Sequence, residues 1–330
     1  MTTYDMIPTE RVKYGVVLND LDADLLLPCH LGGWELRWAT VEEIAEFQPG
    51  INSYARSHFG QPASQELAIT PQGSGYLYTC ITDSTQWRYS IVQPANPSAM
   101  LGARLAEALR LSVADLRVEH WVGQRPPGSD GPQWTPGGSP GQCVQFFGEF
   151  RRFLPAKPDL SELQAVTKLR QEFDDAKYPS ITRTVALFRE LDSVPEHSRT
   201  KLLGYFGVLE GVLSHAPSPQ DPVDSVTRQL KRNLILLDNR APAGENLGVS
   251  EFEGAKDSSQ VIAKLYSYRS AIAHGGDGTG DLQWFEDRRP VRWQGDPPRL
   301  WLHYFMRLLV KRVLVAALRE PQLVHDLRAA

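Results

Sequence analysis

The residues best suited to catalytic chemistry are Arg269 and His274, near the end of the segment SSQVIAKLYSYRSAIAHGG (258–276). Apolar residues recur at helical spacing, Asp257 and Ser258 are good helix-starting residues, and a Gly-Gly pair closes the segment. We therefore predict a helix with Arg269 in its last two turns and His274 at its C-terminal end. The two side chains differ by a rotation of roughly 140° on an ideal helix, so we expect them to converge on a groove running past the helix end.

An arginine and a histidine without a neighbouring carboxylate or cysteine suit the metal-free cleavage of RNA. Histidine titrates near neutrality and can move the proton when a 2′-hydroxyl attacks its neighbouring phosphate. Arginine is always charged, and its fork of donors matches the oxygens of a phosphorane. The same spacing also fits a helix C-terminus with two solvated basic residues. Arg319 and His325 have a similar spacing, but Pro321 lies between them and breaks the helix.

A glutamate in the segment YFGVLEGVLSH (205–215) is the expected partner of the arginine. On a helix, Glu210 lies next to an apolar face, so it is partly buried and needs a partner. We expect an ion pair between Glu210 and Arg269, which fixes the guanidinium fork and preserves its charge. The alternative is an ordinary solvated glutamate. The apolar face consists of Leu202, Tyr205, Leu209 and Leu213.

The motif in these two segments resembles the HEPN superfamily, particularly its Apea-like branch. The matching residues are Tyr266, Arg269, Ser270, Ile272, Ala273, His274 and Gly275, with Leu209 and Glu210 upstream. The resemblance covers the last half of the chain, from about Asp159 onward, and implies an all-α bundle whose penultimate helix carries the motif. It further implies a homodimer with the motif at its two-fold interface, and RNA as the substrate.

The resemblance also assigns roles to the motif residues. Arg269 and His274 are the implied catalytic pair of a metal-independent endoribonuclease that leaves 2′,3′-cyclic phosphate and 5′-hydroxyl ends. Ser270 and Tyr266 shape the groove, with Tyr266 stacking on a base. The Apea-like likeness suggests anti-phage defence, in which the first domain restrains the nuclease or senses a phage-derived or protein trigger.

Two other interpretations stay open at the level of sequence. The helical half is a non-catalytic module that binds RNA or a protein partner, with Arg269 and His274 as structural pairs. Alternatively, the chain is a toxin neutralised by nucleotide transfer to a tyrosine two residues after the histidine. Gly276 occupies that position and counts against the toxin.

The charge of the chain bears on how it could contact nucleic acid. The 330 residues carry a net charge of -4, which argues against a protein that coats nucleic acid nonspecifically. Residues 1–156 hold 11 of the 35 basic and 16 of the 39 acidic side chains, which leaves 24 basic and 23 acidic ones for residues 157–330. The second half is therefore the expected host of a local basic groove.

No cofactor or metal is expected, because the sequence holds no phosphate loop and no metal-type pairing of histidines. Cys29, Cys80 and Cys143 form neither a zinc spacing nor a disulfide framework. We expect no signal peptide, because Asp5, Glu10 and Arg11 interrupt any apolar run. A reducing cytoplasm is the expected compartment.

Residues 1–155 read as an α+β domain. Alternating segments predict strands at 11–18 and 33–40, and Thr40 with Glu43 forms a capping box for a helix in TVEEIAEF. We further predict a hairpin of 75–83 with 86–93, a helix at 99–111, and strands at 116–122 and 142–150. A Pro/Gly-rich loop connects the last two strands, and in it Arg125 and Trp134 are available to a ligand.

Residues 156–330 read as successive helices after the proline-containing boundary FLPAKPDLSE. The run GGDGTGD after His274 is expected to be a flexible exit. The window 300–320 is the most hydrophobic one, but charges interrupt it, so we predict the closing helix of the bundle and no membrane anchor. The predicted helices span 160–173, 180–191, 197–215, 224–238, 258–274 and 300–320.

Overall fold

The fold was obtained as a computed structural model. The contacts between residues group the chain into two compact units, Met1–Glu172 and Phe173–Ala330. The sequence places the boundary earlier, at 155/156. Helix α4 (Leu160–Glu172) accounts for the difference, because it packs on α2 (Gly102–Leu111) and on strand β3 of the first unit. The structure describes residues 12–17, 20–22, 24–47, 66–72, 75–81, 89–96, 99–123, 134–136, 155–156, 158–195, 198–216, 225–242, 244–252, 257–290 and 298–329.

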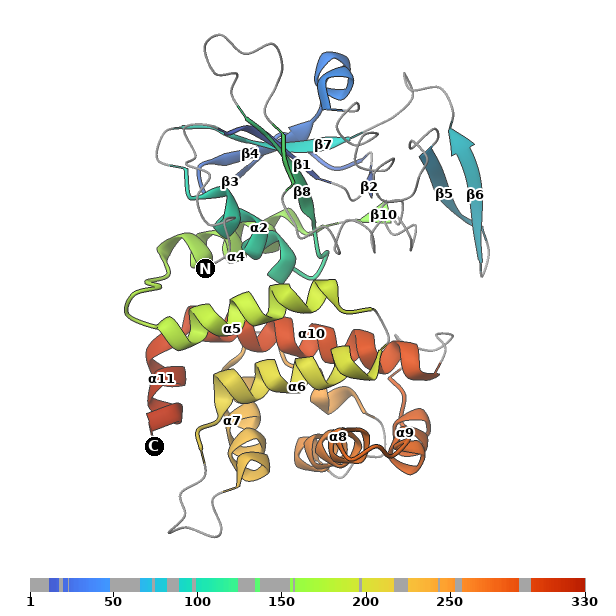
Figure 1. Ribbon diagram of the computed structural model, residues 1–330, viewed down its shortest axis with the longest axis vertical. Helices are drawn as coiled ribbons and strands as arrows, with labels where there is room; N and C mark the ends of the chain where they lie inside the picture. Colours follow the sequence, from blue (N-terminus) through green and yellow to red (C-terminus); the bar gives the residue numbers. More distant parts are fainter. Residues whose placement is uncertain are drawn as a thin grey trace. The chain divides into compact units, whose positions relative to one another are not determined.

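The first unit is built on an antiparallel sheet of six strands (Figure 1). Its order is β3 (Cys29–Leu31), β4 (Trp34–Trp38), β7 (Ser90–Pro94), β1 (Val12–Val17), β8 (Val118–Gly123) and β9 (Trp134–Pro136). Two small sheets accompany it: β5 (Glu66–Gln72) pairs with β6 (Gly75–Ile81), and β2 (Asp20–Leu21) pairs with β10 (Pro155–Ala156).

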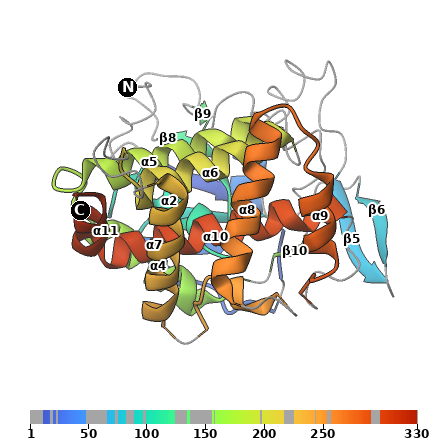
Figure 2. The same ribbon diagram turned by 90° about the horizontal axis from the view of Figure 1, so that it is seen from below.

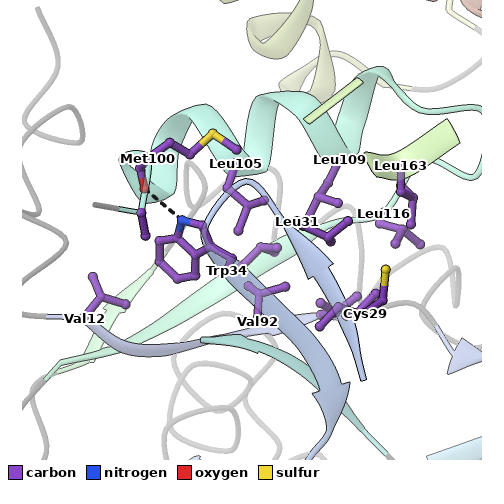
Figure 3. Packing of buried hydrophobic residues seen from close by; sticks show 14 of the residues in the cluster. Val12, Cys29, Leu31, Trp34, Val92, Met100, Leu105, Leu109, Leu116 and Leu163 are labelled. Atoms are coloured by element: carbon purple, nitrogen blue, oxygen red, sulfur yellow. Dashed lines mark hydrogen bonds between the residues drawn. The ribbon is translucent and has the colours of Figure 1, made fainter. Parts of the chain in front are cut away.

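Both faces of the six-stranded sheet are covered, which explains why β1 is buried along most of its length. On one face Trp34 lies at the centre of an apolar cluster with α2 and α4, and its indole N–H donates to the Met100 carbonyl at 2.8 Å (Figure 3). On the other face the helix at 41–47 inserts Phe47 between Tyr14 and Tyr89. Side chains that alternate along β1 therefore belong to two separate cores.

Two local predictions for this unit have opposite outcomes. The capping box is confirmed, since the Glu43 amide donates to Thr40 Oγ1 at 3.2 Å and the Thr40 amide donates to the Glu43 carboxylate at 2.9 Å. The predicted hairpin of 75–83 with 86–93 is wrong. Strand β6 pairs instead with the preceding β5, with Gln72 opposite Gly75, and β7 lies between β1 and β4. The shorter connection between β5 and β6 favours their pairing, because short loops lose less entropy on closing.

The predicted strand 142–150 and Arg125 lie outside the described residues, while Trp134 begins β9.

The second unit is helical. The long helix α10 (Pro298–Arg319) packs against helices on several sides, among them α5 (Pro179–Glu190) and α6 (Arg199–Leu213), and its apolar side chains supply much of the core. Helix α8 (Ser258–Ala273) runs across α6 (Figure 2). Its described residues also form α7 (Val226–Arg240), α9 (Thr279–Glu286), α11 (Pro321–Ala329) and two short 3-10 turns, Leu191–Ser193 and Val249–Glu251.

The α+β part followed by a helical part is thus confirmed as a fold class. The predicted helices correspond to α4, α5, α6, α7, α8 and α10, whereas α9 and α11 were not predicted as separate helices. Pro321 ends the continuity of α10 and begins α11, where its missing amide costs no intrahelical bond. Among the described helices, none combines the length and the apolar character that a bilayer crossing requires.

Candidate active site

The C-terminal end of α8 is a well-formed cap that places His274 at the surface. Its residues form a Schellman motif, in which the Gly275 amide donates to the Ile272 carbonyl at 3.1 Å and the Gly276 amide donates to the Ala271 carbonyl at 2.8 Å. Gly275 has φ +81°, a conformation that glycine adopts without steric cost. The backbone therefore turns away immediately after His274.

The run after His274, which we predicted to be a flexible exit, contains the start of α9 at Thr279. The Asp277 carboxylate accepts the Thr279 amide at 2.9 Å, and α9 begins there. From α9, Asp281 accepts a hydrogen bond from Ser267 at 2.7 Å and pairs with Lys264 at 3.1 Å, both on α8. These contacts fasten α9 to α8 and hold the segment that carries the histidine.

Arg269 points from α8 toward α6, where it forms the expected pair with Glu210. The distance from Arg269 Nη2 to Glu210 Oε1 is 3.4 Å, and the two side chains are 35% and 26% exposed. The predicted ion pair is therefore confirmed. The Arg269 Nε is buried and has no hydrogen-bond partner among the described residues. A buried donor without a partner is costly, and it often indicates a functional group.

Tyr266 adds a contact that the sequence did not indicate. Its hydroxyl donates to Glu210 Oε1 at 2.5 Å, its ring meets Phe206 edge-on at 5.6 Å, and the Arg269 guanidinium lies 5.9 Å from the ring centroid. Burial, and secondarily the hydrogen bond to Glu210, raise the pKa of the Tyr266 phenol far above its ordinary value. An aromatic residue at helical spacing is typical of packing, so the sequence held no signal for the role of this hydroxyl.

His274 occupies the C-cap position of α8 and is exposed. Its amide donates to the carbonyl of the half-buried Ser270 at 3.1 Å. Within the described part of the chain, no hydrogen bond or ion pair engages its imidazole. Both ring nitrogens are therefore available to accept or donate a proton.

Arg199 is a third basic residue at this end of α8, and sequence reasoning missed it. It is exposed in the first turn of α6, and its Nη1 donates to the Gly276 carbonyl at 3.3 Å. The two residues are distant in the chain, so only the packing of α6 on α8 brings them together. Arg199 and His274 thus lie at the C-terminal end of α8, while Arg269 lies in the last two turns of the same helix and reaches toward Glu210.

Two other histidines belong to packing elsewhere in the bundle. His215 follows α6 and lies 3.2 Å from the Gln229 side chain of α7. His325 meets the Tyr178 ring edge-on at 6.2 Å, and Arg319 pairs with Glu245 at 2.5 Å. The second Arg/His pair of the sequence is therefore split between two environments.

Comparison of the chain with protein-family models, curated proteins and solved structures finds no significant match.

Proposed function

We propose that this protein is a metal-independent endoribonuclease of the HEPN type, acting at the C-terminal end of α8. The observation that carries the proposal is the combination of two groups on one helix end. One is Arg269, which pairs with Glu210 and whose Nε has no partner among the described residues. The other is an exposed histidine with an unengaged ring.

In the proposed reaction, a ribose 2′-hydroxyl attacks the adjacent phosphorus and the bond to the 5′-oxygen breaks. The His274 imidazole accepts the hydroxyl proton or donates one to the leaving oxygen. The Arg269 guanidinium binds the phosphate oxygens and stabilises the negative charge that grows in the phosphorane. When His274 takes the 2′-hydroxyl proton, water protonates the leaving 5′-oxygen; when His274 protonates that oxygen, water takes the hydroxyl proton. The products carry 2′,3′-cyclic phosphate and 5′-hydroxyl ends.

The resemblance to HEPN domains extends the proposal to assembly and control. Two chains pair through their helical units, so that two half-grooves combine into one RNA site. The first unit restrains cleavage or senses a phage-derived or protein trigger. This biological role depends on the resemblance alone.

The test is cleavage of single-stranded RNA by the full chain with a chelator present. Wild type cleaves, and Arg269→Ala and His274→Ala each lower the rate by about 100-fold to 10,000-fold. Arg319→Ala and His325→Ala are the matched controls, because they remove the same residue types from the other end of the bundle and leave the rate unchanged. Circular dichroism checks that every variant is folded. Cleavage that stops with chelator, or that survives in His274→Ala, contradicts the proposal.

A second candidate function is a non-catalytic helical module that binds RNA or a protein partner. The Arg269–Glu210 ion pair favours it, because an arginine paired in this way also serves helix packing. The same experiment separates the two candidates. Binding of RNA without cleavage, at an affinity that His274→Ala leaves unchanged, supports the module.

A further inference from the structure

Two donors share one carboxylate oxygen at the α6–α8 contact. The Tyr266 hydroxyl lies 2.5 Å from Glu210 Oε1, at the short end of the range for a hydroxyl donating to a carboxylate. The Arg269 Nη2 lies 3.4 Å from the same atom, which is longer than an ordinary hydrogen bond between a guanidinium and a carboxylate. Glu210 is therefore held chiefly by the phenol and only loosely by the arginine.

A second arginine–carboxylate pair in the same chain shows the contrast. Arg37 in β4 donates to both oxygens of Glu43 at 2.9 and 2.7 Å, in the usual bidentate geometry. Arg269 has no such pairing, and its Nε is buried without a partner among the described residues. A guanidinium offers five N–H donors, so most of those on Arg269 are not engaged by the glutamate. Because the Nε is buried, the donors that a phosphate can reach are those on the Nη atoms of this 35% exposed side chain.

We infer that Tyr266 is a positioning residue, whose hydroxyl occupies Glu210 and thereby keeps the donors of Arg269 available to a phosphate. The inference rests on the proposed function, because it gives those donors an RNA phosphate to bind. The negative charge of Glu210 orients the guanidinium. The Tyr266 hydroxyl, by donating to Glu210, prevents the carboxylate from forming a close ion pair with Arg269. The Tyr266 ring stays packed against Phe206, so the hydroxyl alone carries this role.

The arrangement predicts a non-additive effect of two substitutions. Tyr266→Phe keeps the ring but frees Glu210, which then closes on Arg269 and competes with phosphate. Glu210→Gln removes the competing charge, so the loss of the phenol no longer matters. The double variant Tyr266→Phe/Glu210→Gln should therefore be more active than Tyr266→Phe alone.

The experiment measures kcat and KM for single-stranded RNA, together with the Kd for a 2′-O-methyl RNA of the same sequence, which cannot be cleaved. We expect Tyr266→Phe to raise KM and Kd by about tenfold, since a strengthened charged hydrogen bond must be broken to bind phosphate. The double variant should return to within about threefold of Glu210→Gln, as expected when coupled residues are changed together. Tyr178→Phe, whose hydroxyl donates to the neutral Gln322 side chain at 3.1 Å, is the matched control and leaves both constants unchanged.

The outcomes separate this inference from the proposed function. If wild type binds the 2′-O-methyl RNA but cleaves no RNA, the proposed function fails and the Kd values alone decide the inference. If Tyr266→Phe leaves Kd unchanged, or the double variant is weaker than both single variants, the inference is overturned. If Arg269→Ala leaves Kd unchanged, Arg269 holds no phosphate and the inference is overturned as well. A purely structural role would lower the thermal midpoint without rescue by Glu210→Gln.

Discussion

Removal of the Tyr266 hydroxyl should lower the free energy of unfolding at neutral pH. A hydrogen bond to a charged group contributes about 1.5–3 kcal/mol. Glu210 is 26% exposed and has Arg269 as a second partner, so water and the guanidinium recover part of that energy. We therefore expect Tyr266→Phe to cost about 1–2 kcal/mol, near the lower end of the range for such bonds.

The cost should disappear at alkaline pH, because burial and the bond to Glu210 raise the pKa of Tyr266 in the folded state. A raised pKa stabilises the fold only while the unfolded chain keeps its proton. That contribution is fully present below the unfolded pKa of about 10 and is lost as pH rises above it. At pH 11 the unfolded tyrosine is mostly ionised, so wild type loses up to about 1.4 kcal/mol relative to Tyr266→Phe, and less to the extent that water screens the half-buried phenol.

The assay is urea unfolding of the full chains, followed by circular dichroism at a wavelength dominated by the helices, at several pH values between 8 and 11. The difference between wild type and Tyr266→Phe isolates Tyr266 from Tyr14, whose pKa is raised by burial and by Glu46 in the first unit. A difference that stays constant over this pH range would show that the Tyr266 phenol has no raised pKa in the fold. It would mean that the phenol is not held as a neutral donor in the fold.

Two further predictions concern backbone and charge. Gly278→Ala should destabilise the chain by about 2–3 kcal/mol in the same unfolding assay, since its φ is +65° and an added Cβ would lie 2.5 Å from the Tyr268 ring. Gly275→Ala, at φ +81° with open space around it, is the matched control, and its cost should be about 1 kcal/mol. Burial would raise the pKa of Glu43, but its hydrogen bonds to Arg37 and Thr40 lower it overall. The stability that Glu43 contributes is therefore present above its unfolded pKa and lost as pH falls through the lowered folded value. The difference in urea midpoint between wild type and Glu43→Gln should vanish in acid, and a difference that persists there would contradict the assignment.

Local signals in the sequence were sufficient to predict most helices and their caps. Thr40 and Glu43 form the predicted capping box, and Asp257 accepts the Gln260 amide at 2.8 Å where α8 begins. Such contacts depend on residues a few positions apart, so the sequence contains them. The strand partners of β6 and β7 depend instead on which distant segments meet, and there the prediction failed.

At the candidate site, too, contacts that follow from local sequence were predicted, and contacts between distant segments were mostly missed. Glu210 was expected to pair with Arg269 because a partly buried carboxylate on an apolar face needs a partner, and the pair is present. The contact of Arg199 with Gly276 and the bond from Tyr266 to Glu210 were not predicted. Both depend on how α6 crosses α8, which no spacing within one helix determines.

The most direct test of the proposed chemistry replaces a single 2′-hydroxyl in the substrate. The position at which the full chain cleaves a single-stranded RNA is first mapped with chelator present, and the ribose on the 5′ side of that bond is then changed to 2′-deoxyribose. We expect that this bond is no longer cut, and that the unmodified RNA yields a 2′,3′-cyclic phosphate only when Arg269 and His274 are both intact. Cleavage at the deoxy position, or products with a 5′-phosphate, would contradict it.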